Sequence, residues 1–220
     1  MKFKAAIFDL DGTLLDTLDD LANSMNYALC EMGFASHPVE AYKYFVGDGL
    51  KTETTRALPP DNRGEQTVEK CMKIAREHYS QHWADNTRAY PGIAEMLGFL
   101  QDKKIPLAVL SNKPDDFTQL TVGKLLCDFA FEVVQGVSEK VKKKPDICGA
   151  LAIIEKIGVQ PNEVLYLGDT DTDMKTAVSA GMFAVGALWG FRKADELLKN
   201  GAKVIVETPR QVIELFKENC

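Results

Sequence analysis

The stretch AAIFDLDGT, residues 5–13, places two acidic side chains directly after a short apolar run. The run 5–8 carries no polar side chain, which is typical of a strand buried on both faces of a parallel sheet. Asp9 and Asp11 are two residues apart, so in an extended chain their side chains point the same way. Gly12 lets the backbone turn sharply after them. The stretch therefore predicts a buried strand whose end presents two carboxylates to one pocket.

Two carboxylates this close repel each other, and unless a cation or a shared proton intervenes, the pKa of one of them must rise. Either outcome is useful for catalysis. Taken alone, the same residues fit equally well a strand end followed by an Asp-rich helix cap. The stretch by itself leaves both interpretations open.

The rest of the chain alternates between apolar runs and amphipathic segments. Further strand-like runs occur at 106–110, 131–134, 164–167 and 183–188. Between them, apolar residues recur three or four positions apart, as on one face of a helix. Alternating strands and helices predict an α/β fold, a doubly wound parallel sheet covered by helices on both faces.

One region breaks this alternation. Residues 16–88 show helical periodicity without a convincing strand. Asp16 and Thr17 can cap an entering helix, and Tyr90-Pro91-Gly92 is a turn signal leading back to the sheet. We therefore expect an α/β core formed by residues 1–15 and 89–220, with an all-helical domain, 16–88, inserted into it.

Composition excludes several functional classes. The 220 residues include 26 Lys and Arg against 32 Asp and Glu, a net charge of −6, which is the wrong sign for gripping nucleic acid or anionic lipid by charge. The five cysteines, Cys220 among them, are widely spread without a CxxC pair, which indicates a reducing compartment. No apolar stretch approaches the ~18 residues of a membrane span, and the N-terminal run is too short for a secretory leader. We expect a soluble, cytoplasmic protein.

A second acidic cluster, GDTDTD at residues 168–173, also follows a strand-like run. It is not a calcium-binding EF-hand loop, because Met174 and Ala180 stand where that loop needs Gly and Glu. In an open parallel sheet, ligands bind beyond the carboxyl ends of the strands, so this cluster and Asp9 could converge on one cation. Carboxylates with few other ligands suit Mg²⁺, which also bridges to phosphate.

Two further segments offer what an anionic substrate needs. Ser111-Asn112 follows a predicted strand and supplies a hydroxyl, an amide and the N-terminus of the next helix. Lys144 precedes Pro145, a favoured first helical residue, which would place its ammonium near another helix N-terminus. Each segment alone also fits a plain helix cap or the solvated basic run 140–144.

Together these segments resemble the haloacid dehalogenase superfamily, in its phosphoglycolate phosphatase-like branch. Asp9-Leu10-Asp11-Gly12-Thr13 is similar to the family's DxDGT motif, and Gly168-Asp169 with Asp173 to its GDxxxD motif. Ser111 matches the second motif and Lys144 the third. That third motif usually reads KPxP, and Ile147 stands in place of its second proline, so Lys143 stays an alternative to Lys144.

The resemblance implies a mechanism and a role for each of these residues. Asp9 would be the nucleophile that forms an aspartyl phosphate, and Asp11 the general acid and then base. Mg²⁺ would be held by Asp9, Asp169 and the backbone carbonyl of Asp11. The phosphoryl oxygens would be bound by Ser111, Asn112 and Lys144, while Asp173 would orient Lys144 or a water.

The inserted helices would then form a cap over the site, with the loop Gly47-Asp48-Gly49 nearest the substrate. Within the superfamily that this chain resembles, dehalogenases and phosphonate hydrolases lack an aspartate at the position of Asp11, so the resemblance implies a phosphate ester, whose leaving group needs protonation. We expect a phosphatase of a small phosphorylated metabolite, phosphoglycolate first, with no nucleic acid or membrane partner, as a monomer or homodimer. A phosphosugar mutase, a pyrophosphatase, a nucleotidase and a non-catalytic binding protein remain alternatives.

Overall fold

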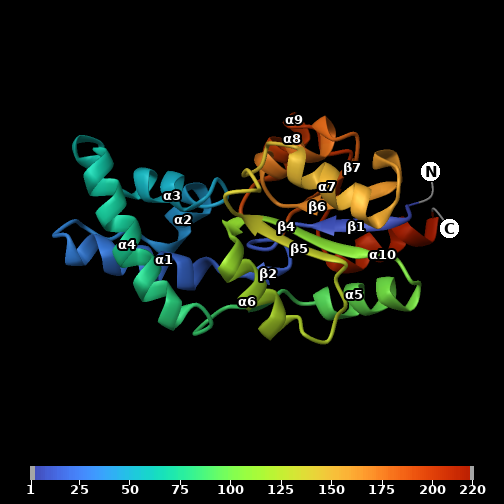
Figure 1. Ribbon diagram of the computed structural model, residues 1–220, viewed down its shortest axis with the longest axis horizontal. Coiled ribbons are helices and arrows are strands. Elements are labelled where there is room, and N and C mark those ends of the chain that lie inside the picture. The colour runs from blue at the N-terminus through green and yellow to red at the C-terminus, as the bar shows by residue number, and fades with distance from the viewer. Residues whose placement is uncertain (1–2, 219–220) are drawn as a thin grey trace. The chain divides into compact units, whose positions relative to one another are not determined.

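The computed structural model describes residues 3–218 and divides into two compact units. One unit contains the described residues up to Leu15 together with those from Ala89 onward. The other is the insertion Asp16–Arg88. In Figure 1 the first unit carries the sheet, and the second is the group of helices α1–α4, drawn in blue to teal.

The first unit is built on one six-stranded parallel sheet. Its strands are β1 (Ala5–Phe8), β4 (Leu107–Pro114), β5 (Val133–Val137), β6 (Val164–Gly168), β7 (Phe183–Ala187) and β8 (Val204–Val206), in the order β5-β4-β1-β6-β7-β8. Strand β1 lies at the centre, where Phe8 is in register with Val109 on one side and Leu167 on the other. Every predicted apolar run forms a strand, and β8 is an additional edge strand. The doubly wound α/β prediction is confirmed.

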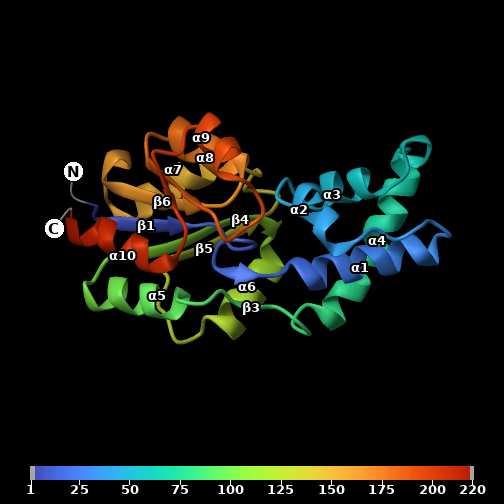
Figure 2. The same cartoon turned by 180° about the vertical axis from the view of Figure 1, so that it is seen from behind.

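Helices cover both faces of this sheet. One face carries α5 (Ile93–Asp102), α6 (Asp115–Leu125) and α10 (Pro209–Glu218), and the other carries α7 (Cys148–Ile157), α8 (Asp171–Ser179) and α9 (Ala194–Lys199). Figures 1 and 2 show the two layers above and below the strands. Because side chains alternate along a strand, Ala6 and Phe8 enter one core, while Ala5 and Ile7 enter the other. All four are fully buried, as the apolar run predicts.

The second unit is helical. It contains α1 (Leu18–Glu31), α2 (Tyr42–Phe45), α3 (Leu50–Ala57) and α4 (Glu65–His82), with short 3₁₀ turns at Val39–Ala41 and Pro60–Asn62. Helices α1 and α4 pack through buried side chains such as Met25 and Cys71, whose sulfur atoms lie 3.8 Å apart. Short strands β2 (Leu15–Asp16) and β3 (Arg88–Ala89) pair where the chain enters and leaves the insertion.

Two predicted helix starts are wrong. Strand β4 continues through Pro114, so Ser111 and Asn112 lie within the strand and not at the N-terminus of α6. The cause is a register shift of β4 against β5 between Leu110 and Pro114, which lengthens the strand. Likewise, α7 begins at Cys148 and not at Pro145, because residues 143–146 form a turn closed by a hydrogen bond from the amide of Asp146 to the carbonyl of Lys143.

Two further predictions concern thiols and membranes. Cys30, Cys71, Cys127 and Cys148 are free thiols, and Cys220 lies outside the described residues. Within residues 3–218, no helix combines the length and apolar character that a bilayer span requires.

Candidate active site

Three buried carboxylates converge at the carboxyl ends of β1 and β6. Asp9 directly follows β1, Asp169 directly follows β6, and Asp173 lies in the first turn of α8. One oxygen of each lies within 4.8 Å of the others. The proximity follows from topology, because β1 and β6 are parallel neighbours and their carboxyl ends meet at one edge of the sheet. The carboxylates of Asp9 and Asp169, far apart in sequence, thus form one cluster.

The side chain of Lys144 lies among these carboxylates. Its ammonium is 2.8 Å from Oδ1 of Asp9 and 2.6 Å from Oδ1 of Asp173, and the side chain is only 2% exposed. Burial alone would lower the pKa of Lys144, but the charges of Asp173 and Asp9 outweigh burial and raise it well above its ordinary value. Lys144 is thus the lysine that contacts the carboxylate cluster, whereas Lys143 is exposed.

Asp173 is oriented by the start of α8. Thr170 caps this helix, and its hydroxyl donates to Oδ2 of Asp173 at 2.6 Å while the Thr170 amide donates to the same oxygen at 3.0 Å. This reciprocal capping box explains why Thr and Asp stand three residues apart here. The hydroxyl of Tyr166 donates to Oδ1 at 3.1 Å, so Asp173 presents a fixed oxygen to Lys144. The predicted orienting contact between Asp173 and Lys144 is present.

Asp169 is held by two segments of the core. The hydroxyl of Thr13 donates to its Oδ1 and the amide of Phe191 to its Oδ2, each at 2.8 Å. The indole of Trp189 in turn donates to the carbonyl of Thr13 at 2.9 Å. A Cβ on Gly190 would overlap the side chain of Asp169. The segment 189–191 after β7 thus clamps this carboxylate, a role that the sequence analysis missed.

Crowding of the carboxylates makes their charged forms unfavourable. Burial, followed by repulsion from Asp173, raises the pKa of Asp169 to about 7, despite the hydrogen bonds from Phe191 and Thr13. Burial and the charges of Asp173 and Asp169 likewise raise the pKa of Asp9 well above its ordinary value, against the opposing effect of Lys144. With all three carboxylates ionised, the cluster and the Lys144 ammonium together carry a net charge of −2. Oxygen donors with this charge suit a hard divalent cation, so the cluster can bind a metal ion.

Asp11 lies outside this cluster and pairs with a different lysine. The ammonium of Lys113 is 3.1 Å from Oδ1 and 3.2 Å from Oδ2 of Asp11. The Lys113 side chain is 3% exposed and that of Asp11 is 17% exposed. Lys113 is not among the predicted site residues, and its place directly after the predicted pair Ser111-Asn112 is the signal that could have revealed it.

The two predicted phosphate-binding residues on β4 differ in what they contact. Ser111 is buried, and its hydroxyl accepts a hydrogen bond from the Lys113 amide at 3.2 Å. The side chain of Asn112 instead contacts the backbone of Lys144: its amide donates to the Lys144 carbonyl at 3.2 Å, and its Oδ1 accepts from the Lys144 amide at 2.7 Å. Asn112 thus fixes the position of Lys144, a role that the sequence analysis did not predict.

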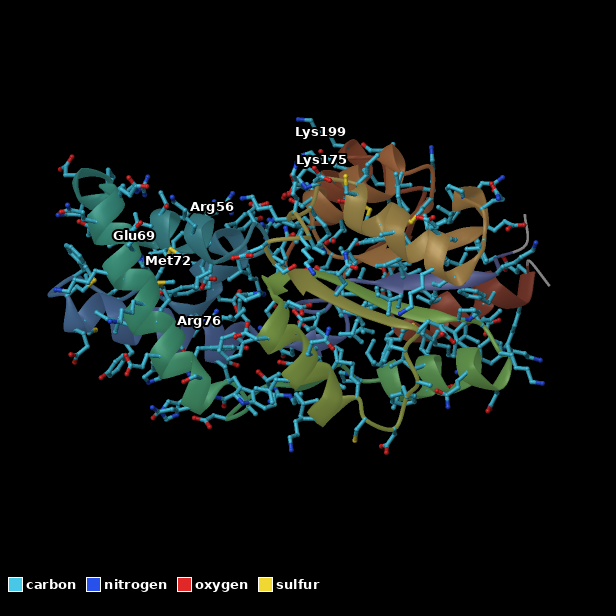
Figure 3. The ribbon with its side chains drawn as sticks, viewed as in Figure 1. Arg56, Glu69, Met72, Arg76, Lys175 and Lys199 are labelled. Carbon is cyan, nitrogen blue, oxygen red and sulfur yellow. The ribbon has the colours of Figure 1, made fainter. Side chains whose placement is uncertain are left out.

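The predicted substrate loop, residues 47–49, belongs to the helical unit and is stabilised within it. Gly47 and Gly49 have φ angles of 106° and 84°, a left-handed conformation that favours glycine. The carboxylate of Asp48 pairs with Arg56 of α3 at 2.6 Å, and Arg56 also donates to the carbonyl of Phe45 at 3.1 Å. Figure 3 shows Arg56 on this helix. Arg56 therefore ties the loop to α3.

Known proteins are similar to this chain in both sequence and fold. The chain matches the model of the haloacid dehalogenase-like hydrolase family over residues 6–187. It is 31% identical to a phosphoglycolate phosphatase of Chromobacterium violaceum, over 97% of this chain and 96% of the relative, and 31% identical to one of Nitrosospira multiformis, over 100% and 98%. A crystal structure from Lactobacillus delbrueckii subsp. bulgaricus superimposes with a TM-score of 0.92 at 31% identity, over 98% of this chain and 99% of the other. The predicted resemblance is confirmed, and the chain belongs to the haloacid dehalogenase-like hydrolase family.

Proposed function

We propose that this protein is a Mg²⁺-dependent phosphatase that hydrolyses small phosphate monoesters through an aspartyl phosphate on Asp9. The observation that carries the proposal is the position of Asp9 at the end of β1, beside the Lys144 ammonium and within reach of Asp169 and Asp173. A carboxylate nucleophile, a fixed cation and a metal-binding pair are the parts that phosphoryl transfer requires. Relatives named phosphoglycolate phosphatase support phosphoglycolate as the leading substrate.

The carboxylates of Asp9 and Asp169, with the backbone carbonyl of Asp11, would hold the metal ion. When bound, Mg²⁺ reduces the repulsion between an anionic nucleophile and an anionic phosphoryl group. The raised pKa values of Asp9 and Asp169 support a divalent ion at this place, because a bound cation would favour the ionised carboxylates, whose net charge with Lys144 is −2. Asp173 serves by holding the ammonium of Lys144.

The chemical steps then use the chain's own residues. A carboxylate oxygen of Asp9 attacks phosphorus, the bond from phosphorus to the ester oxygen breaks, and Asp11 donates a proton to that leaving oxygen. Water next attacks phosphorus in the aspartyl phosphate while Asp11 takes its proton; the bond from phosphorus to the Asp9 oxygen breaks, which restores the Asp9 carboxylate and releases phosphate. Ser111 and Lys144 bind the transferring phosphoryl oxygens, and Asn112 keeps Lys144 in place.

The helical insertion 16–88 would act as a cap that excludes water from the site formed by residues 1–15 and 89–220. Its loop Gly47-Asp48-Gly49, stabilised by Arg56, would contact the part of the substrate away from phosphorus. The partner would be a small phosphorylated metabolite, and the enzyme would act in the cytoplasm as a monomer or homodimer.

Phosphate release from a substrate panel tests the proposal. The purified protein with saturating Mg²⁺ is offered phosphoglycolate, sugar phosphates, pyrophosphate and nucleotides. We expect release to be fastest from phosphoglycolate, and Asp9→Asn to lower turnover at least about 1,000-fold, because the nucleophile is lost. Asp102→Asn, an exposed change at the end of α5, is the matched control and should leave turnover unchanged.

Two outcomes would contradict the proposal. Undiminished turnover in Asp9→Asn, with an unaltered circular dichroism spectrum, would remove Asp9 as nucleophile. Conversion of β-glucose 1-phosphate to its 6-phosphate isomer without phosphate release would identify a mutase instead, in which a sugar hydroxyl and not water accepts the phosphoryl group.

A further inference from the structure

Lys113 is a buried cation that the steps above do not use. Its side chain is 3% exposed, and its ammonium lies nearly equidistant, at 3.1 and 3.2 Å, from the two carboxylate oxygens of Asp11. A lysine is seldom buried to this extent unless it is paired. The geometry is that of one ammonium straddling one carboxylate, which restricts rotation of the carboxylate about its own axis.

An irregularity in the backbone of β4 lies next to Lys113 and affects where its side chain points. Between the pairs Leu110–Gln135 and Pro114–Val137, strand β4 advances four residues while β5 advances two. Such a bulge redirects side chains near the end of a strand. A Cβ on Gly136 of β5 would lie only 2.6 Å from the carbonyl oxygen of Lys113, so glycine is what permits the close approach.

Hydrogen bonds on both sides then hold the Lys113 backbone. Its amide donates to the hydroxyl of Ser111 at 3.2 Å, and its carbonyl accepts from the hydroxyl of Thr118 at 3.3 Å. A lysine anchored in this way presents its ammonium from a fixed strand and not from a flexible loop. The pairing with Asp11 is therefore a built feature of the core unit.

We propose that Lys113 is a positioning residue for Asp11, which keeps the Asp11 carboxyl group where it can reach the leaving oxygen. This inference rests on the proposed function and adds a residue to it. A general acid acts only within hydrogen-bonding reach of the oxygen that it protonates, and a misplacement of about 1 Å can cost roughly 100-fold in rate. Lys113 supplies that placement without contacting the phosphoryl group.

The leaving group distinguishes this role from the alternatives. An alkyl phosphate must receive a proton from Asp11 as its ester oxygen departs, since an alkoxide is a poor leaving group. Acetyl phosphate releases acetate, a weak base that departs without a proton. Loss of Lys113 should therefore slow the alkyl esters and spare acetyl phosphate. The appropriate quantity is kcat/KM, which reports the steps up to release of the first product.

The experiment compares Lys113→Met, Lys113→Arg and a control, Lys142→Met, on ethyl phosphate, phosphoglycolate and acetyl phosphate. Lys142 is a suitable control because its side chain is 78% exposed. In Lys113→Met we expect kcat/KM to fall at least about 30-fold for the two alkyl esters and less than about 3-fold for acetyl phosphate, given that general acid catalysis contributes ~100-fold or more. Lys113→Arg should restore part of the loss, and Lys142→Met should match the wild type.

Ratios between substrates measured on one sample cancel any unfolded fraction, so a poorly folding variant still gives an answer. Equal losses on all three substrates would mean that Lys113 acts on the phosphoryl group. A loss confined to phosphoglycolate would mean that Lys113 binds the carboxylate of that substrate. Either result overturns the inference, as does an unchanged kcat/KM on every substrate. Wild-type turnover and the Asp9→Asn variant test the proposed function separately. In an Asp11→Asn background, Lys113→Met should cause no further selective loss on ethyl phosphate.

Discussion

Each unit of the molecule contains a buried aspartate, and the surroundings of the two carboxylates differ. Asp20 of the helical unit is 1% exposed, and Asp169 of the core is fully buried. Asp20 is surrounded by donors: the amide and side chain of Asn86 and the amide and hydroxyl of Thr87 all donate to its carboxylate, at 2.7 to 3.0 Å. Asp169 has two donors but also lies beside the carboxylates of Asp9 and Asp173.

The two pKa values move in opposite directions as a result. Burial alone would raise the pKa of Asp20, but the hydrogen bonds from Thr87 and Asn86 outweigh it and lower the value. Burial and repulsion from Asp173 raise the pKa of Asp169 to about 7. A carboxylate satisfied by donors stabilises the fold, whereas one crowded by other carboxylates costs free energy until a cation binds. The contrast separates Asp20, whose contacts stabilise the helical unit, from Asp169, whose crowding agrees with the metal site proposed above.

The largest expected effect tests that contrast by removing each kind of carboxylate. Asp20→Ala should lower the free energy of unfolding by about 3 kcal/mol, because the amide of the buried Thr87 and the amide of Asn86 lose a charged acceptor. In the metal-free protein, Asp9→Asn should leave stability unchanged or raise it, because a carboxyl group whose ionisation is unfavourable at this buried place is replaced by a neutral amide, and the oxygen of that amide can still accept from Lys144. Urea unfolding in the presence of a chelator measures both.

Asp19→Ala is the matched control for this comparison, since it sits in the same turn of α1. It should change the free energy of unfolding by less than about 1 kcal/mol, the range of a helix-dipole effect. An equal loss of stability in Asp9→Asn and Asp20→Ala would show that the core carboxylates are as well satisfied as Asp20, and the contrast would fail.

The second effect is a pH dependence whose sign differs between the two carboxylates. The folded-state pKa of Asp169 is about 7, above the ~3.9 of an unfolded chain, so between these values the folded protein binds the extra proton. Without metal, its contribution to stability therefore falls as pH rises from about 4 to 7, by on the order of a few kcal/mol. Asp20, with its lowered pKa, contributes stability that is present above the unfolded pKa and lost as pH falls through the folded value, below about 4.

Urea titrations at pH 5, 6 and 7 on the wild type and Asp169→Asn isolate this effect, because their difference cancels the other titrating groups. With a chelator, the wild type should lose stability relative to the variant as pH rises, and Mg²⁺ should abolish the trend by favouring the charged carboxylate. If, in the presence of chelator, the free energy of unfolding of the wild type rose relative to that of Asp169→Asn between pH 5 and pH 7, the crowding argument would be refuted.

The fold was largely readable from the sequence, and the reason is local. The run 5–8 is apolar at every position because β1 is buried on both faces, and that burial leaves no other pattern possible. The end of β4 was not readable. Its register shift depends on how Gly136 of the neighbouring strand accommodates Lys113, a pairing between residues distant in sequence. No periodicity within β4 alone records it.

For the site too, residues in local sequence patterns were predictable, and contacts between residues distant in sequence were not. Asp9, Asp169 and Asp173 stand in recognisable patterns, so their convergence followed from the order of strands. Two contacts around the cluster were not predicted. Lys113, which pairs with Asp11, has only its place after Ser111-Asn112 to distinguish it from other lysines, and the contact of Asn112 with the Lys144 backbone depends on where the turn 143–146 lies. Residues that act by holding another residue leave a weaker pattern than residues that act directly.

The smallest expected effect concerns the clamp on Asp169. A Cβ on Gly190 would overlap both the side chain of Asp169 and the carbonyl oxygen of Gly12, so Gly190→Ala should displace this carboxylate from its place beside Asp9. We expect Mg²⁺ affinity, measured by calorimetry and by the thermal shift on adding the ion, to fall about 10-fold, or ~1.4 kcal/mol.

Gly98→Ala in α5 is the control, because nothing lies within 4 Å of its added methyl group. That change should leave Mg²⁺ affinity alone and stabilise the helix by up to about 1 kcal/mol. Wild-type affinity in Gly190→Ala would mean that the clamp serves folding alone, and that the crowding of Asp169 has no bearing on the ion.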